Sequence, residues 1–479
     1  MSKSIVEQLE PIFNPRSVAI IGASNVPFKW GAQTVQRLIQ TGYSGMIYPV
    51  NPREDFIQGL PAYRSVLDIP ETVDLTIVTV RADQVPQALL ECAEKGIKGA
   101  IVISADFAET GSYGQALQEE ITEIARESSL RIVGPNCMGL WNAAANINTF
   151  PGVSIEGSVG FISQSGSLSH MLARIAGTKG FGMSKIVSVG NQADLDVADY
   201  LEYLVEDPDT EAIAIYLEGF KDGRKLFRVA QETAGLKPVV VYKTGRHPGS
   251  ARVAMSHTAA IIGEDRIFDA MCQQVGFIRS PDLYNLLDMA GVLTRQPLPG
   301  GNRVGIQGTG GLCMVIADAC LSLGMQIPEI RDADIADVIS GIDFPPHAPP
   351  PRNPIDFAGS HTALMDATAL NNLAKLDYID GVISNRPVSF NLPVETAEQQ
   401  KLDTRVGELL VAIPRDYGKP AVLIGPTAGI GMEMFGKSST ITKVLDDAGI
   451  PSFSTPEEAV RAMYALIKYA EIKKRFARS

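Results

Sequence analysis

The sequence is poor in cysteine, in aromatic residues and in long apolar runs. Among 479 residues it has five cysteines, none of them paired as C-x-x-C, and 7% aromatic residues. This usage argues against a disulfide framework or a cysteine-based zinc site and is typical of reduced cytoplasmic proteins. No stretch reaches the roughly 18 uninterrupted apolar residues of a membrane-spanning helix, and the N-terminus lacks an apolar signal core. We therefore expect a cytoplasmic protein that does not bind a membrane.

Blocks of like charge are also missing. The net charge is -12, from 54 acidic and 42 basic residues scattered along the chain. That balance disfavours nonspecific binding to nucleic acid or to an anionic membrane, so anionic ligands must be held locally. A chain of this length exceeds the roughly 250 to 300 residues of a single core, which predicts several domains.

Short β-branched runs alternate with helix-length amphipathic segments through nearly the whole chain. This pattern is typical of parallel sheets covered by helices, so the predicted class is α/β with three doubly wound domains. The predicted boundaries are 1–150, 151–296 and 297–479, with an Asn-rich loop at 141–150 and a Pro/Gly linker at 296–301. The strand candidates of the first domain are 17–21, 46–50, 74–80, 99–104 and 131–133.

Each predicted domain opens with a strand, a turn of small residues and a helix. Amides at a helix N-terminus bind phosphate, and glycine lets the backbone come close. The first such turn is Gly22-Ala23-Ser24, and the helix after it begins near Lys29 and Gly31. It is not a full G-x-G-x-x-G motif.

The second strand argues for CoA over NAD at this turn. An NAD site favours an acidic residue at the end of that strand, where it holds a ribose hydroxyl. Here the strand ends in Asn51-Pro52-Arg53, and a basic residue suits an extra phosphate. A tight turn without a ligand remains the alternative.

The second turn is Ser163-Gln164-Ser165-Gly166 and the third is Gly308-Thr309-Gly310-Gly311. The second turn superficially resembles the nucleophile elbow G-x-S-x-G, but Ser163 replaces the first glycine, which disfavours a serine hydrolase. Two such helix N-termini facing one another would hold a single dianionic phosphate.

Five histidines are present, and His257 differs from the others in its setting. It lies in a loop of small residues, Met255–Ala260, between a predicted strand and a predicted helix. Neutral imidazole is a competent nucleophile, and a mobile loop lets it carry a phosphoryl group between sites. Glu218, at the end of another strand, is placed to orient it. Taken alone, a loop histidine is more often structural.

The remaining histidines give weaker signals. His170 is expected on a helix surface or in the core, while His347 and His361 flank a Pro-rich loop and are weaker candidates for contact with substrate.

Several motifs in one order carry a family resemblance. They are Pro15–Ser24, Gly134–Gly139 (Gly-Pro-Asn-Cys-Met-Gly), Ser163–Gly166, Ser188–Asn191, Tyr216–Gly219 and Ser256–Thr258. Together they resemble the NDP-forming acyl-CoA synthetases, relatives of succinyl-CoA synthetase, over almost the entire chain. The resemblance implies a Rossmann-like CoA-binding domain followed by two flavodoxin-like domains of the succinyl-CoA-ligase type.

The resemblance also implies roles for residues. His257 is phosphorylated and Glu218 supports it. CoA contacts Gly22, Ala23, Ser24, Lys29, Asn51, Pro52, Arg53 and Asn136. Phosphate is held by Ser163, Gln164, Ser165, Gly166, Gly308, Thr309, Gly310 and Gly311. No metal ligand is predicted in this chain.

The implied activity is that of the α subunit of an ADP-forming acyl-CoA ligase acting on a small carboxylic acid, with acetate as the default. ATP or ADP and Mg2+ are expected on a partner, because no segment here is long enough for the family's ATP-grasp module. The resemblance thus implies an ATP-grasp β subunit in an α2β2 assembly. The identity of the acid, the physiological direction and the nucleotide base are not fixed by the sequence.

Three positions depart from the family pattern. Asp106 replaces a usual glycine, Arg81 replaces a usual proline, and the third turn differs from the common Asn-Gly-Gly-Gly. The partner motif Asn353-Pro354-Ile355-Asp356 is intact.

Rival functions remain. Gly431–Ser438 matches the phosphate-loop motif G-x-x-x-x-G-K-S literally, but it does not directly follow a strand. A CoA-binding scaffold without phosphoryl transfer is a second rival. An NAD-dependent dehydrogenase is a third, disfavoured by the missing ribose-binding acid.

Overall fold

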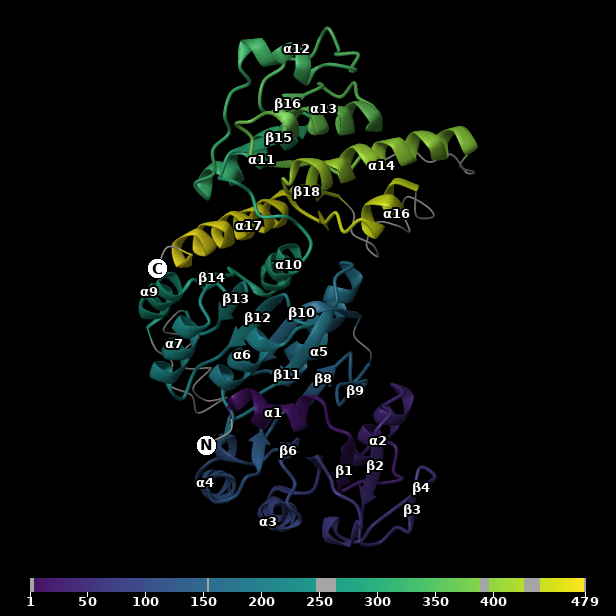
Figure 1. The fold of residues 1–479 in the computed structure, drawn as a ribbon, viewed down its shortest axis with the longest axis vertical. Coiled ribbons are helices and arrows are strands. Elements are labelled where there is room, and N and C mark those ends of the chain that lie inside the picture. Colours follow the sequence, from purple (N-terminus) through teal and green to yellow (C-terminus); the bar gives the residue numbers. More distant parts are fainter. Residues whose placement is uncertain (1–3, 153–154, 247–263, 388–395, 426–439, 478–479) are drawn as a thin grey trace. The chain divides into compact units, whose positions relative to one another are not determined.

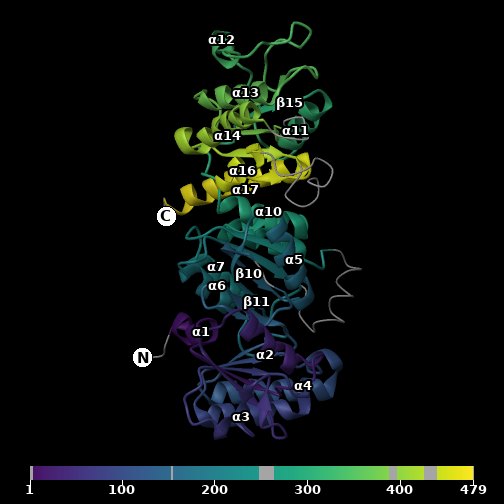
Figure 2. The same ribbon diagram turned by 90° about the vertical axis from the view of Figure 1, so that its right-hand side faces the viewer.

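The computed structural model describes residues 4–152, 155–246, 264–387, 396–425 and 440–477, shown in Figures 1 and 2. Its internal contacts divide the chain into two compact units. Unit 1 comprises Met1–Ile175 with Phe181–Leu283, and unit 2 comprises Ala176–Gly180 with Tyr284–Ser479. The predicted α/β class is confirmed, whereas the boundaries near 150 and 296 stay a prediction. Among the described helices, none is long and apolar enough to cross a membrane.

The first sheet of unit 1 has five parallel strands in the order β2-β1-β5-β6-β7. Its strands are β1 Ser17–Ile21, β2 Met46–Val50, β5 Leu75–Val78, β6 Gly99–Val102 and β7 Arg131–Val133. Each lies within its predicted range. β1, β5 and β6 are buried along their whole length, which is why they read as continuous apolar runs. A short hairpin, β3 Phe56–Ile57 and β4 Leu60–Pro61, stands apart from this sheet.

Helices cover both faces of the first sheet. Side chains alternate along β1, so Val18 and Ile20 join one core and Ala19 and Ile21 join the other. The first core includes residues of α1 Ile5–Phe13 and α2 Trp30–Gln40. The second core includes residues of α3 Val85–Lys95 and α4 Ser112–Glu127, which lie side by side in Figure 1.

The second sheet of unit 1 has seven strands in the order β14-β13-β12-β10-β11-β8-β9. The strands are β8 Gly139–Asn142, β9 Ile147–Asn148, β10 Glu156–Ser163, β11 Met183–Ser188, β12 Ala212–Leu217, β13 Val239–Lys243 and β14 Ile278–Arg279. The helices are α5 Gly166–Thr178, α6 Val197–Glu206, α7 Gly223–Glu232 and α9 Asp265–Val275. Ile162 and Ile215 of this sheet belong to the same core as Val18 and Ile20. The first two sheets therefore share one apolar core.

The segment 141–150, expected to be a loop, takes part in an antiparallel hairpin. β8 pairs with β11 and β9 pairs with β8. Asn142 and Asn148, which made it look like a loop, are buried and have hydrogen-bond partners. Asn142 Nδ2 donates to Phe13 O (2.9 Å), and Asn148 Nδ2 donates to Gly152 O (2.8 Å). Side-chain hydrogen bonds therefore let polar residues occupy strands.

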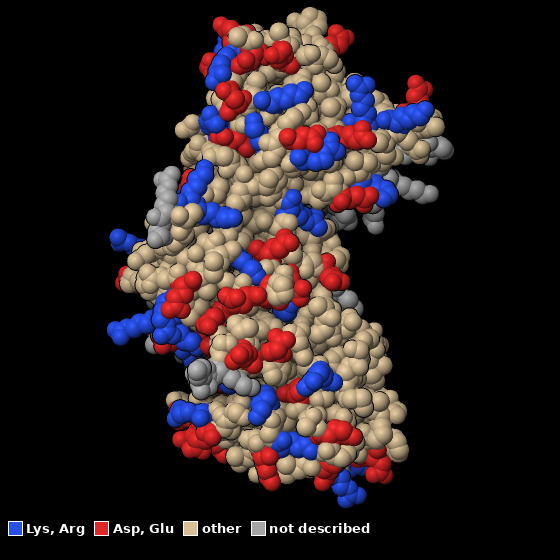
Figure 3. Space-filling model, in the orientation of Figure 1, with Lys and Arg blue, Asp and Glu red and all other residues tan. Residues whose placement is uncertain are grey.

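Unit 2 is built on a parallel sheet in the order β16-β15-β17-β18-β19. Its strands are β15 Val304–Gly308, β16 Ile355–Asp356, β17 Gly381–Asn385, β18 Ala421–Ile424 and β19 Ser452–Phe453. Its helices are α10 Leu283–Leu293, α11 Gly311–Ser322, α12 Ile335–Val338, α13 Ala363–Lys375, α14 Ala397–Tyr417, α16 Thr440–Asp447 and α17 Pro456–Phe476. Within this unit the Lys179 ammonium contacts both carboxylate oxygens of the fully buried Asp288, each at 2.7 Å. On the face drawn in Figure 3, basic and acidic side chains are interspersed.

A buried ion pair lies in the interior of unit 1. Lys185 on β11 is 2% exposed, and its Nζ lies 2.7 Å from Asp207 Oδ1, on a side chain that is 5% exposed. Asp209 accepts a second bond from the same ammonium at 3.0 Å. Removing one partner of such a pair leaves a buried, uncompensated charge.

We therefore expect Lys185→Met to lower the free energy of unfolding of unit 1 by about 3 to 5 kcal/mol. Arg16→Met is the matched control, because Arg16 pairs with Asp74 while 91% exposed and should cost less than about 1 kcal/mol. Urea titrations followed by tryptophan fluorescence measure this unit, since both tryptophans, Trp30 and Trp141, lie in it. Equal midpoints for the two variants would contradict a structural role for the pair.

Candidate functional site

The first glycine-rich turn lies at the carboxyl edge of the first sheet, where β1 ends. Gly22 has a φ of +89°, and a Cβ atom there would lie 2.8 Å from Thr79 Oγ1. A Cβ atom at Gly31 would clash with the carbonyl oxygen of Gly22. Glycine at both positions therefore lets α2 begin directly against the turn. The strand order reverses between β1 and β5, which is where doubly wound sheets bind ligands.

Asn51 ties the end of β2 to this turn. Its Nδ2 donates to Ala23 O (2.7 Å), and its Oδ1 accepts from Arg53 N (2.9 Å). Lys29 is exposed at the start of α2. The structure thus gathers at one edge the predicted CoA contacts Gly22, Ala23, Ser24, Lys29, Asn51, Pro52 and Arg53.

Asn136, the remaining predicted CoA contact, lies where the first and second sheets meet. Its φ is +55°, and its Nδ2 donates to Asn191 Oδ1 (3.3 Å) in the loop after β11. Asn191 Nδ2 in turn donates to Glu109 Oε2 (2.5 Å) and Gln118 Oε1 (3.0 Å). One amide therefore joins Asn136 to two side chains from the α4 region.

The substitution at Asp106 preserves this arrangement. Asp106 has a φ of +74°, a conformation that glycine adopts freely and that Asp tolerates better than most residues. Glu109 Oε1 accepts from the backbone amides of Asp106 (2.8 Å) and Phe107 (3.1 Å), which fixes the carboxylate that contacts Asn191. At the other departure, Arg81 forms an exposed ion pair with Asp83.

The second turn is linked to Glu218 through Gln164. Gln164 is 7% exposed, and its Oε1 accepts from the backbone amides of Glu218 and, at 3.0 Å, of Gly219. The Glu218 side chain, 8% exposed, accepts from Tyr216 Oη at 3.3 Å. Burial and the nearby Glu218 charge raise the pKa of the Tyr216 hydroxyl, so Tyr216 stays a donor. Within the turn, Ser165 N donates to Ser163 Oγ (3.2 Å) just before α5 begins at Gly166.

His257 lies outside the described residues, in the segment 247–263. The chain enters that segment after β13, which is the neighbour of β12, the strand that leads to Glu218. Leu217 pairs with Lys243, and Thr244 N donates to Leu217 O (2.9 Å), so both strands end at one edge. The segment that carries His257 therefore begins at the same edge of the second sheet at which Glu218 lies.

A cavity of about 620 Å³ opens beside these residues. Its walls include Gln164, Asn191 and Phe220 from the loops after β10, β11 and β12, and Gln118 and Thr122 from α4. The carboxyl ends of parallel strands are where α/β proteins place ligands, and this volume is in the range of small-molecule sites.

The third turn lies in unit 2, between β15 and α11. Gly310 has a φ of +53°, and its amide donates to Asp356 Oδ1 (3.0 Å). Asn353 fixes the segment from which Asp356 comes, because its Oδ1 accepts from Ile306 N (2.9 Å). The second and third turns belong to different units, so the binding of one phosphate by both turns stays a prediction.

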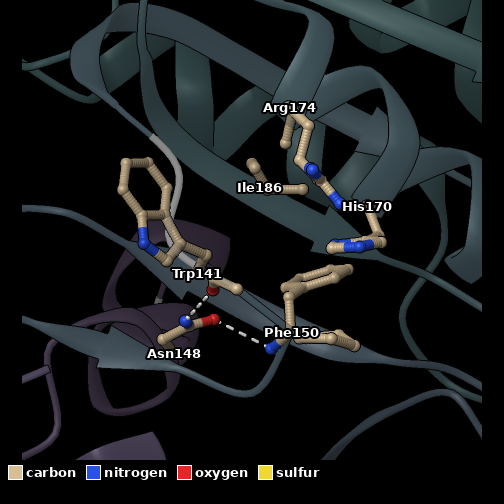
Figure 4. A pocket seen from close by; sticks show the side chains of 9 residues that line it. Trp141, Asn148, Phe150, His170, Arg174 and Ile186 are labelled. Carbon is tan, nitrogen blue, oxygen red and sulfur yellow. Dashed lines mark hydrogen bonds between the residues drawn. The ribbon is translucent and has the colours of Figure 1, made fainter. Parts of the chain in front are cut away.

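His170 lies in a small pocket of unit 1 that has no room for a substrate. Figure 4 shows His170 and Arg174, both from α5, beside Phe150 and opposite Asn148. The pocket volume is about 10 Å³, enough for one water molecule at most. Burial, with the charges of Arg174 and Arg37, lowers the pKa of His170, which favours the neutral imidazole.

The residues that sequence reasoning missed act through contacts distant in the chain. Glu109 and Gln118 lie in no predicted motif, and the motif Ser188–Asn191 did not indicate that Asn191 joins them to Asn136. The phosphate-loop-like segment Gly431–Ser438 lies outside the described residues. Across the described part of the chain, no three His, Cys, Asp or Glu side chains are placed to bind a metal.

Family models match both halves of unit 1. Residues 16–143 match a CoA binding domain, and residues 156–293 match the succinyl-CoA ligase like flavodoxin domain. Among solved structures, the dinucleotide-forming acetyl-coenzyme A synthetase 1 of Ca. Korarchaeum cryptofilum, in complex with phosphate and ADP, is similar at a TM-score of 0.84. It is 31% identical, and the match covers 98% of both chains.

Curated relatives are similar over nearly the whole chain. The ADP-forming acetate–CoA ligase of Methanocaldococcus jannaschii is 35% identical over 97% of this chain, which spans 64% of that longer protein. The α subunit of the ADP-forming acetate–CoA ligase II of Pyrococcus furiosus is 36% identical, with 97% of this chain and 98% of that protein covered. The chain therefore belongs to the family of ADP-forming acetate–CoA ligase α subunits.

Proposed function

We propose that this chain, with a β subunit, interconverts acyl-CoA, ADP and phosphate with a carboxylic acid, ATP and CoA through a phosphohistidine at His257. The observation that supports this proposal most directly is a set of hydrogen bonds between the loops at the carboxyl ends of the strands in unit 1. The Asn136–Asn191 bond links the CoA edge of the first sheet to the second sheet, and the Gln164–Glu218 bond links the second turn to the proposed partner of His257. The 620 Å³ cavity opens beside both bonds and offers room for the acyl group.

In the direction of acyl-CoA formation, the phosphoryl group passes from His257 to the acid carboxylate. The P–N bond breaks, a P–O bond forms, and the imidazole is released. The CoA thiol loses its proton and attacks the acyl carbon, which expels inorganic phosphate. Glu218 orients the imidazole as its hydrogen-bond acceptor. Ser163, Gln164, Ser165 and Gly166 hold the phosphoryl oxygens.

CoA is held at the edge formed by the first turn and the end of β2. Gly22 and Gly31 fit this role, because a Cβ atom at Gly22 would clash with Thr79 and one at Gly31 with the carbonyl oxygen of Gly22, which would displace the turn and helix start proposed to bind the CoA phosphates. Arg53 and Lys29 supply positive charge to its phosphates. ATP or ADP and Mg2+ bind on the partner, which we propose is an ATP-grasp β subunit in an α2β2 assembly.

We place the enzyme in the cytoplasm, supported by five cysteines that are all free and buried. Acetate is the default acid. The cavity also leaves room for larger acids, and relatives named for 4-hydroxybutyrate and trans-ferulate belong to the same set of similar proteins.

Labelled ATP separates this function from its rivals. Incubation of the chain and its partner subunit with ATP labelled in the γ-phosphate should give an acid-labile, base-stable label on this chain. His257→Asn should abolish the label and lower acyl-CoA formation at least about a hundredfold, since the nucleophile is gone. His347→Gln is the control: His347 is exposed and is at most a candidate for substrate contact, so the label on this chain should survive its substitution.

Other outcomes of the labelling experiment would indicate one of the rival functions. A label formed from ATP without the partner would indicate a phosphate loop at Gly431–Ser438. CoA binding with no label under any condition would indicate a scaffold, and binding of NAD in its place would indicate a dehydrogenase.

Substitution of Asn191 tests whether the hydrogen bonds between these loops support CoA binding. Asn191→Ala removes the amide that holds Asn136, Glu109 and Gln118, so we expect the Kd for CoA to rise about tenfold, as for loss of a hydrogen bond to a charged group. Isothermal titration of the purified chain with CoA measures it. Gln87→Ala, which truncates an exposed amide on α3, should leave the Kd unchanged. An unchanged Kd for Asn191→Ala would show that the edge does not depend on this contact.

A further inference from the structure

The side-chain NH2 group of Gln164 has no hydrogen-bond partner within the described part of unit 1, although the residue is only 7% exposed. The oxygen of the same side chain has two. Oε1 accepts from the backbone amides of Glu218 and, at 3.0 Å, of Gly219. Polar groups on buried side chains almost always have a partner, so we expect a ligand or a water molecule to accept from Nε2.

The orientation of the Gln164 amide is fixed by the backbone. A backbone amide only donates, so the side-chain atom that faces the nitrogens of Glu218 and Gly219 is the oxygen. The NH2 group is therefore the polar end that Gln164 offers to the 620 Å³ cavity, whose wall it helps to form. The backbone amide of Gln164 already donates to Tyr216 O at 3.3 Å. The side-chain NH2 group is thus the donor that remains to this residue.

The position of this donor favours an acyl oxygen over a phosphoryl oxygen. Gln164 lines the cavity, whereas the other residues of the second turn, Ser163, Ser165 and Gly166, do not. Ser165 and Gly166 instead lead into α5, whose N-terminus is suited to an anion. An acyl phosphate bound with its phosphoryl group at the start of α5 and its acyl group in the cavity would have its acyl oxygen beside Gln164.

We propose that Gln164 Nε2 is a catalytic hydrogen-bond donor to the acyl oxygen of the substrate. This role rests on the proposed function and refines the phosphoryl contact given there for Gln164. The side chain holds the acyl oxygen, and the phosphoryl oxygens are left to Ser163, Ser165 and Gly166.

One donor serves both chemical steps, because the same oxygen takes part in each. When one carboxylate oxygen attacks the phosphorus, the P–N bond breaks and the other oxygen becomes the carbonyl of the acyl phosphate. When the CoA sulfur adds to the acyl carbon, the π electrons move onto that carbonyl oxygen, which becomes an oxyanion. The C–O bond to phosphate then breaks, the carbonyl forms again, and the thiol proton leaves on hydrogen phosphate. A donor aimed at a developing oxyanion contributes about a hundredfold to a thousandfold in rate.

Two variants separate the donor from the contacts of the side-chain oxygen. Gln164→Glu keeps an oxygen for the amides of Glu218 and Gly219 but replaces the NH2 group by a second oxygen. Gln164→Met removes both groups. Gln87→Glu is the matched control, since it makes the same change at an exposed amide on α3.

Single-turnover labelling with the partner subunit measures each step. The chain takes up label from ATP labelled in the γ-phosphate, and acetate and CoA are then added. Gln164→Glu should gain the label at the parental rate and lose it to the acid about a hundredfold more slowly. Lowering the pH should narrow the second difference, because the introduced carboxyl can donate in place of the amide once it is protonated.

Two results of this experiment would overturn the proposal. Loss of label at the parental rate in Gln164→Glu, with slower loss in Gln164→Met, would show that the side chain acts only through its contacts with the loop. An equal decrease in the gain and the loss of label would assign the NH2 group to the phosphoryl group.

The acyl contact is also measurable without the phosphohistidine. Isothermal titration of the isolated chain gives the ratio of the Kd for acetyl-CoA to the Kd for CoA. Gln164→Glu should raise this ratio about threefold to tenfold, as for loss of one hydrogen bond, and Gln87→Glu should leave it unchanged. An unchanged ratio in Gln164→Glu contradicts the acyl contact. A raised ratio on a chain that takes up no label would contradict the proposed function and support the contact.

Discussion

Two amide side chains, the partly buried Asn191 and the buried Gln164, hold the loops at the carboxyl edges of the two sheets in unit 1, and the proposed chemistry depends on them. Asn191 contacts Asn136 after β7, Glu109 after β6 and Gln118 within α4, while Gln164 fixes the backbone after β12. A buried amide that loses its partners costs free energy, so these loops cannot shift independently. The arrangement gives the edge the rigidity that positioning a thioester and a phosphoryl group requires.

The shared apolar core explains why the first two sheets form one unit. α1 packs on the first sheet and also meets the second, with the rings of Phe13 and Tyr203 stacked at 4.3 Å between centroids. Apolar residues of both sheets then belong to a single cluster. The edge proposed to bind CoA and the edge proposed to face the phosphorylated histidine therefore belong to one unit, whereas the third turn belongs to unit 2.

The strands and glycine-rich turns could be predicted from the local sequence pattern. The contacts between distant segments could not. The buried strands of the first sheet and the three glycine-rich turns were predictable because β-branched runs and small residues signal them locally. The hairpin within 139–148 was not, since its asparagines are satisfied by partners such as Phe13, more than a hundred residues earlier. The role of Asp106 follows only from its backbone conformation, which the sequence does not display.

The same reason explains which site residues were found. Glu218 and Asn136 were predicted from motifs, but the side chains that contact them, Gln164 and Asn191, lie more than fifty positions away. Asn191 and Glu109 are separated by 82 positions, and Asn136 and Asn191 by 55. No spacing in the sequence indicates such pairs. A single sequence could therefore identify individual site residues but not the hydrogen bonds between them.

We propose that this chain alone carries out the steps between acyl-CoA with phosphate and the phosphohistidine, and that only the exchange with ADP or ATP needs the partner. The most direct test of this proposal supplies the isolated chain with acetyl-CoA and radiolabelled inorganic phosphate, without partner subunit or ADP. We expect release of CoA and an acid-labile label on this chain that His257→Asn abolishes. The absence of label on a chain that turns over acetyl-CoA normally once its partner and ADP are added would contradict it.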